Sequence, residues 1–135
     1  SGGNGIDHGY KLASEPERWI IRPANRPIGP KMQESAEALP AIGDSAVIDA
    51  AGFGAACLRF APDLAGLKGH VDDAYFTEAA HDAFIGPHPA LPFPGLKLGL
   101  DLARSRASLG IMLGMVGASG TEGLVGRGVA PWPVG

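Results

Sequence analysis

A turn of small and polar residues near the middle of the chain carries the first candidate chemistry. Gly43, Asp44 and Ser45 stand directly before a mostly apolar segment. Glycine lets the backbone approach a ligand closely, and a polar turn ahead of a helix can present unpaired N–H groups to a carboxylate or phosphate. We predict that these residues form one wall of a substrate-binding site. The alternative is that Asp44 or Ser45 caps a core helix, the commoner use of such residues.

Two further glycines, Gly52 and Gly54, extend this predicted wall. Each costs about 1 kcal/mol relative to alanine inside a helix, so their presence in a segment that otherwise favours a helix implies a packing or ligand reason. They do not form a dinucleotide fingerprint, because the third glycine is missing at the required spacing.

Arginine is the residue expected to hold an anionic substrate, and Arg127 and Arg18 are the candidates. Arg127 stands between Gly126 and Gly128 in an otherwise apolar run. A guanidinium group binds a planar carboxylate through two parallel hydrogen bonds. The alternative for Arg127 is a strand position that faces water.

A second polar turn follows an apolar segment and includes Ser119, Gly120 and Thr121. We predict an anion cradle there, since α/β proteins place ligands at the ends of their strands. The alternative is a simple flexible turn.

His8 is the candidate catalytic base, because an imidazole can accept a proton near neutral pH. Its neighbour Asp7 should point to the opposite face of a strand, so the two are not expected to pair. Ser1 is a weaker candidate, as an N-terminal nucleophile whose own amine serves as base, against the alternative of a cut site or cloning boundary. Cys57 is predicted to be a small core residue.

Of the other histidines, His81 is predicted to lie on a helix surface and His88 in a loop. The histidines and the single cysteine show no metal-ligand spacing, so we predict no metal site and no cofactor.

Composition narrows the class of protein. The 135 residues suit one domain, and a net charge of −3 argues against binding to nucleic acid or an anionic membrane surface. One cysteine cannot form an intrachain disulfide, and no apolar stretch is long enough to span a membrane. We therefore expect a cytoplasmic location.

The first half of the chain should begin with a hairpin. Residues 5–12 and 18–21 are predicted to form its strands, joined by a turn at 14–17. The prolines within residues 22–40 predict an extended loop there. We predict helices over residues 45–60 and 71–84, the second with Asp72 as its N-cap.

The second half suggests a crossover. Strands are predicted at residues 96–100, 111–116 and 124–129, with a helix over 101–109 between the first two. That order favours a parallel pair of strands. The predicted fold class is therefore α/β, a single small domain over residues 1–135 or a fragment, with crossover helices and long loops rich in the 21 glycines and 12 prolines.

Several segments together resemble a known family. They are residues 4–10, 18–19, 23, 42–48, 52–55, 61–62, 99–101 and 126–131. In order and spacing they resemble the C-terminal part of the YlbE-like proteins, a bacterial family associated with oxamate carbamoyltransferase in purine degradation. Because members of that family are considerably longer, the resemblance implies that this chain is the C-terminal piece of a longer polypeptide. It assigns no catalytic residue.

We therefore predict part of an enzyme that transfers a carbamoyl or acyl group to or from a small amide or carboxylate. The alternatives are an amidohydrolase, which differs in offering water as acceptor, and a non-catalytic assembly subunit. The expected partners are a small anionic substrate and either a missing N-terminal portion or a companion subunit, within an oligomer. On this view the chain alone should not be independently stable.

Overall fold

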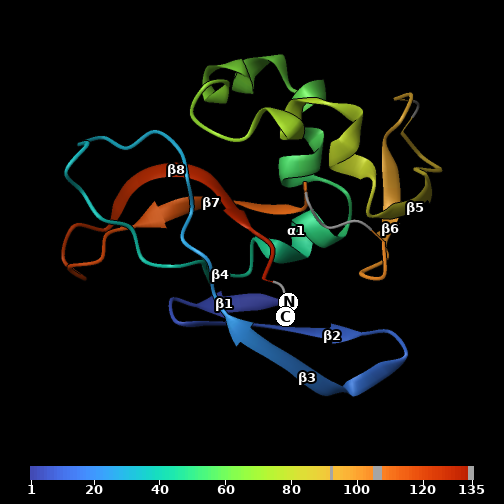
Figure 1. Cartoon of the computed structure of the whole chain (residues 1–135), viewed down its shortest axis with the longest axis horizontal. Helices are drawn as coiled ribbons and strands as arrows, with labels where there is room; N and C mark the ends of the chain where they lie inside the picture. Colours follow the sequence, from blue (N-terminus) through green and yellow to red (C-terminus); the bar gives the residue numbers. More distant parts are fainter. Residues whose placement is uncertain (92, 105–107, 134–135) are drawn as a thin grey trace.

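Paired strands make up most of the regular structure (Figure 1). The computed structural model describes residues 1–91, 93–104 and 108–133, and within them the strands form three antiparallel sheets. The first sheet has the order β3-β2-β1-β4, with β1 at Gly2–Asn4, β2 at Asp7–Leu12, β3 at Glu15–Pro23 and β4 at Ile42–Gly43. The other two pair β5 at Phe84–Pro87 with β6 at Lys97–Leu100, and β7 at Gly110–Val116 with β8 at Leu124–Pro131.

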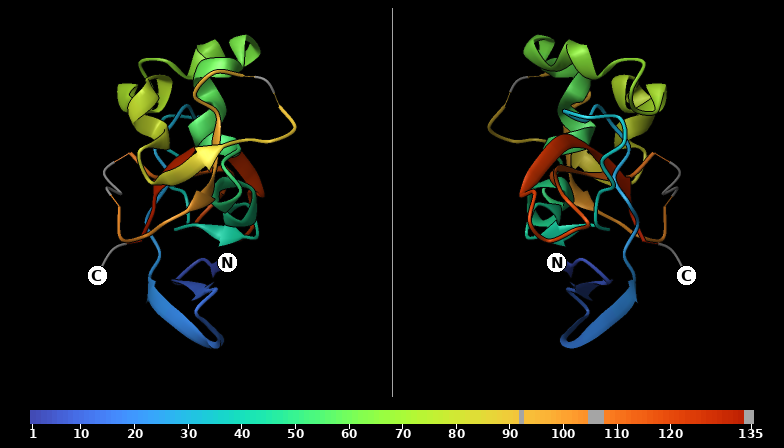
Figure 2. Two further views of the ribbon diagram at one scale, coloured as in Figure 1. Left: turned by 90° about the vertical axis from the view of Figure 1, so that its right-hand side faces the viewer. Right: turned by 90° about the vertical axis from the view of Figure 1, so that its left-hand side faces the viewer.

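The predicted N-terminal hairpin is confirmed as β2 and β3. Its turn is tighter than expected, because Leu12 already pairs with Glu15. Pro16 is tolerated because β3 is the edge strand of its sheet, where one row of backbone groups has no neighbour. The hairpin projects from one end of the molecule, opposite the short helices (Figures 1 and 2).

The β7–β8 pair lies at the centre of the core. Along β7 the alternate residues Ile111, Leu113 and Met115 are buried, as expected for a strand with one inward face. The main core cluster consists of Tyr10, Ala41, Ala46, Ala56, Ala80, Ala83, Phe84, Leu109, Ile111, Leu113, Ala130 and Trp132. Its many alanines allow the short helices to approach the sheet closely.

The proline-rich loop predicted at residues 22–40 is confirmed beyond the end of β3, and it lies along β8. The main chain of Ile28 exchanges two hydrogen bonds with Val129, each of 2.9 Å. A side chain at Gly128 would collide with the Ile28 carbonyl oxygen, and one at Gly126 with that of Pro30. The two glycines that flank Arg127 are therefore required for close contact between loop and strand.

The helix predicted over residues 45–60 is interrupted. Helix α1 covers only Ala46–Ala50, and the 3-10 helix η1 follows at Gly54–Phe60. Gly52 and Gly54 have positive φ angles of 89° and 70°, which no α-helix accommodates. The glycines therefore end one helix and begin another.

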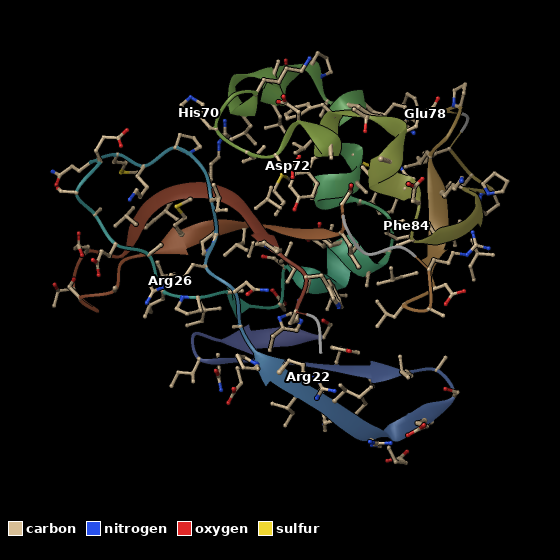
Figure 3. The ribbon with its side chains drawn as sticks, in the orientation of Figure 1. Arg22, Arg26, His70, Asp72, Glu78 and Phe84 are labelled. Atoms are coloured by element: carbon tan, nitrogen blue, oxygen red, sulfur yellow. The ribbon has the colours of Figure 1, made fainter. Side chains whose placement is uncertain are left out.

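The helix predicted over residues 71–84 is also divided, into the 3-10 helices η3 at Asp73–Phe76 and η4 at Glu78–His81. The predicted N-cap is confirmed, since the Asp72 carboxylate accepts from the Ala74 N–H at 2.9 Å (Figure 3). Thr77 breaks the helix because its extended backbone starts a second cap, in which its hydroxyl accepts from Ala79. The 3-10 helix η2, at Pro62–Leu67, lies between η1 and η3 in sequence.

The predicted parallel crossover is wrong. Strand β6 pairs with β5, which was not predicted, and β7 pairs antiparallel with β8 through the turn at residues 117–123. A short turn of this kind joins antiparallel neighbours. Of the helix predicted over 101–109, residues 101–104 form a single turn, and residues 105–107 lie outside the described part. The chain is a small, strand-rich single domain with few helices.

We predict that Gly54→Ala lowers the free energy of unfolding by about 1–3 kcal/mol, because a non-glycine residue is strained at its positive φ. Its Cβ would also stand 2.5 Å from Oδ1 of Asp49. Urea denaturation measures the change. Gly66→Ala is the matched control, since a Cβ there meets nothing within 4 Å and φ is not positive. Equal stability of the two variants would contradict the prediction.

Candidate functional site

A cavity of about 290 Å³ brings two of the predicted substrate-binding residues together. Ser45 lines it from the start of α1 and Arg127 from β8. Leu64, Leu67 and Leu113 contribute apolar walls. The cavity thus combines one cation, one hydroxyl and a hydrocarbon lining, the usual composition of a site for a small anionic molecule.

Arg127 is available to a ligand. Its side chain is exposed and forms no ion pair or hydrogen bond with any residue in the described part of the chain. Since Gly126 and Gly128 lie against the proline-rich loop, alternation along β8 directs Arg127 to the other face of the strand. This placement explains the arginine between two glycines.

Ser45 does not act as a side-chain cap. It occupies the N-cap position of α1 with helical φ and ψ of −54° and −31°, and its hydroxyl makes no capping hydrogen bond. The first backbone bond instead runs from the Val47 N–H to the Asp44 carbonyl at 3.0 Å. Asp44 is exposed, and Gly43 pairs with Gly3 between β4 and β1. The capping alternative is therefore not realised.

Gly52 and Gly54 do not line this cavity. Gly54 instead leaves room for the side chain of Asp49, a buried residue that was not predicted from the sequence. Asp49 is 2% exposed, and its Oδ1 accepts from the Ala55 N–H at 2.8 Å while its Oδ2 accepts from the Met112 N–H at 3.1 Å. Burial raises the pKa of Asp49 to about 7, against the opposing effect of these hydrogen bonds. The sequence carried one sign of this role, because Asp49 is the single acidic residue in the otherwise apolar segment that forms α1.

His81 is buried, so its predicted place on a helix surface is wrong. Its Nε2 lies 3.4 Å from the Gly52 carbonyl oxygen and its Nδ1 3.5 Å from the Arg59 guanidinium. The same carbonyl accepts from the thiol of half-buried Cys57 at 3.3 Å. Burial raises the pKa of Cys57 and lowers that of His81, so both are neutral groups that support the Gly52 turn.

His8 is 1% exposed, and its Nε2 lies 2.9 Å from the Ser1 hydroxyl. Asp7 is exposed on the opposite face of β2, as predicted. His8 does not line the cavity of Ser45 and Arg127. The predicted base therefore lies outside the candidate cavity.

Arg18, the second predicted clamp, is separate from the cavity. It lies in β3 on the projecting hairpin and pairs with Glu15 at 3.0 Å, with both side chains largely exposed. Exposed pairs of this kind contribute little stability. The structure does not bring the two arginines to one site.

The turn with Ser119, Gly120 and Thr121 is exposed and uses its own polar atoms. The Ser119 hydroxyl donates to the Glu122 carboxylate at 2.8 Å and accepts from the Thr121 N–H at 3.3 Å. A carboxylate at this point disfavours a second negative charge. These contacts favour the turn alternative, and anion binding there remains a prediction.

A larger cavity of about 490 Å³ lies under the proline-rich loop, lined by Arg26, Lys31 and Glu37 among others. Its cations are engaged: Arg26 donates to the Ala38 carbonyl and Lys31 donates to that of Ala36. We therefore favour the smaller cavity as the candidate site. His88 lies in a loop, as predicted, where its Nδ1 accepts from two N–H groups.

Within the described residues, no cluster of histidine, cysteine and carboxylate side chains is suited to hold a metal ion. No helix among them is long and apolar enough to cross a membrane.

We predict that Asp49 makes the free energy of unfolding fall as the pH rises from about 4 to about 7, against the opposite effect of His8 and His81, whose pKa values burial lowers. The folded-state pKa of Asp49 is raised, so this carboxyl binds more protons in the folded protein than in the unfolded chain in this window. Asp49→Asn should remove this part of the pH dependence, measured by urea denaturation across the range. Asp63→Asn, at an exposed carboxylate, is the control and should leave it unchanged. An unaltered slope in Asp49→Asn would contradict the prediction.

No protein-family model matches the sequence, and no solved structure matches the fold. The chain is similar to a protein called "Uncharacterized protein YahG" from Escherichia coli (strain K12), with 27% identity over 114 residues. The similar region covers 78% of this chain and 24% of that protein, so the chain spans about a quarter of the length of this relative.

Proposed function

We propose that this chain supplies the carboxylate-binding part of an enzyme that transfers a carbamoyl or acyl group to or from a small amide or carboxylate. The observation that carries the proposal is the cavity shared by Ser45 and Arg127. A cavity of about 290 Å³ suits a small substrate, since drug-sized pockets range upward from roughly 300 Å³.

The chemistry of the lining supports a substrate with two different ends. The Arg127 guanidinium can bind a carboxylate through two hydrogen bonds, and the Ser45 hydroxyl can donate to a neighbouring carbonyl oxygen. Leu64, Leu67 and Leu113 reduce the access of water, which strengthens both interactions. Oxamate, which carries a carboxylate bonded to an amide, has both ends and agrees with the family resemblance.

We propose that the complete enzyme also contains protein beyond this chain. The relative of this chain is about four times as long as the region of similarity, which covers 24% of it. The outer face of the first sheet exposes Trp19 and Ile21, which carry exposed fractions of 54% and 57%. We propose that an additional portion of the polypeptide or a companion subunit supplies the remaining catalytic groups, within an oligomer.

Arg127→Ala and Arg127→Lys should both weaken oxamate binding, roughly tenfold to a hundredfold, because neither side chain reproduces the paired hydrogen bonds of the guanidinium. Titration calorimetry measures binding, and a carbamoyl-transfer assay of the complete enzyme should show a raised KM. Arg18→Ala is the matched control, an exposed arginine outside the cavity. Wild-type binding by the lysine variant would assign Arg127 to a solvent-facing role.

Ser45→Ala should weaken oxamate binding by the equivalent of about 1 kcal/mol, the value of one hydrogen bond. It should leave the melting temperature nearly unchanged, because the hydroxyl caps no backbone group. A lower melting temperature with unaltered binding would show that Ser45 serves the helix and not the ligand.

A further inference from the structure

We propose that Ser1 and His8 form a serine nucleophile and its general base, which accept a small acyl group in a second cavity. The inference is independent of the function proposed for Ser45 and Arg127, because it rests on different residues and a different cavity. The proposed reaction needs only the Ser1 hydroxyl and the His8 imidazole.

The geometry of the pair is that of a nucleophile and base in contact. Oγ of Ser1 lies 2.9 Å from Nε2 of His8, within the distance required for proton transfer. The strand pairing fixes this contact, because Gly2 of β1 pairs with Gly9 and Gly3 pairs with His8 of β2. The first sheet thus places both side chains from adjacent strands.

The surroundings of His8 keep it neutral and in place. The ring is buried and tilted against Trp132, with centroids 5.3 Å apart. Burial lowers the pKa of His8, which favours the neutral form that can accept a proton. When the ring proton resides on Nδ1, Nε2 is free to accept the Ser1 proton. Nδ1 has no hydrogen-bond partner among the described residues, so packing orients this ring and a third polar group does not.

Ser1 lines a cavity of about 250 Å³ that can hold the acyl group. Ser1 is half-buried at its wall, whereas His8 lies behind the serine and does not line it. Leu12, Leu100, Leu102 and Trp132 give the wall a large apolar part, and Tyr10 and Lys11 add polar atoms. The small volume and the apolar part of the wall select a short acyl group, such as that of an acetyl or propionyl ester.

The step balances without a cofactor. Oγ of Ser1 forms a bond to the acyl carbon while its proton passes to Nε2 of His8. The bond from the acyl carbon to the leaving oxygen then breaks, and that oxygen takes the proton from Nε2. A water molecule or an amine reverses the sequence: it gives a proton to His8, takes the acyl group and restores the serine.

The test treats the protein with a fluorophosphonate probe, which labels activated serines, and locates the label by peptide mass spectrometry. We expect the label on Ser1, its loss in Ser1→Ala and labelling roughly a hundredfold slower in His8→Gln. Ser14→Ala, at an exposed serine in the hairpin turn, should label as the wild type does.

Acyl transfer is followed in parallel with p-nitrophenyl acetate and p-nitrophenyl octanoate. A burst of p-nitrophenol with acetate, together with an acetyl group on Ser1, supports the proposal, and the longer ester should react poorly in so small a cavity. Because His8 is buried, His8→Gln could fold poorly. The test does not depend on that variant, because labelling of Ser1 in the wild-type protein supports or overturns the proposal by itself. Absence of label from Ser1, or equal labelling of Ser14, would overturn the proposal.

Discussion

The buried carboxylate of Asp49 is the interaction on which the arrangement of the candidate site depends. It joins three separate elements, because it belongs to α1 and accepts hydrogen bonds from Ala55 in η1 and Met112 in β7. Through α1 it holds Ser45 at the wall of the cavity, and through β7 it holds the strand that pairs with Arg127 of β8. Burying a carboxylate is costly, and the two N–H donors offset part of that cost. An acidic residue can occupy this core only while both donors stay in place.

Close contacts between backbones account for several of the glycines. Gly54 leaves room for the Asp49 carboxylate, Gly52 for the Lys97 carbonyl, and Gly126 and Gly128 for the proline-rich loop. Proline fits the same arrangement. The loop pairs with β8 only at isolated positions such as Ile28 and Lys31, so residues between them need no backbone N–H for pairing. The high content of both residues therefore accompanies an ordered, closely packed structure, in which glycine marks contact between segments distant in the sequence.

The sequence was informative where the signal was local. The hairpin strands, the loop after β3, the Asp72 cap and the strands β6, β7 and β8 follow from alternation, prolines and capping chemistry. The parallel crossover failed because the direction of strand pairing depends on distant partners, which no local pattern contains.

In the candidate site, too, some residues could be identified from local sequence, whereas the contacts between them could not. Arg127 was identifiable as a charge interrupting an apolar run, but its proximity to Ser45 arises only from the pairing of β7 with β8 and the packing of β7 against α1. Asp49 and the burial of His81 were missed because each depends on tertiary contacts. Likewise, the contact of Ser1 with His8 depends on the register between β1 and β2, which the glycines of β1 do not specify by side-chain pattern.

The two proposed sites are close neighbours with packed side chains between them. His8 and Ser45 both border a small space with Ala46, Ile111 and Leu113, and that space has no room for a water molecule. A proton released at His8 therefore has no solvent path through this space to the cavity of Arg127. Each site instead opens to its own cavity: Ser45, just ahead of α1, lines one, and Ala50, the last residue of α1, lines the other. A substrate held by Arg127 can influence the Ser1 and His8 pair only through the packed side chains between them, so mutations in one site should act on the other through stability and position.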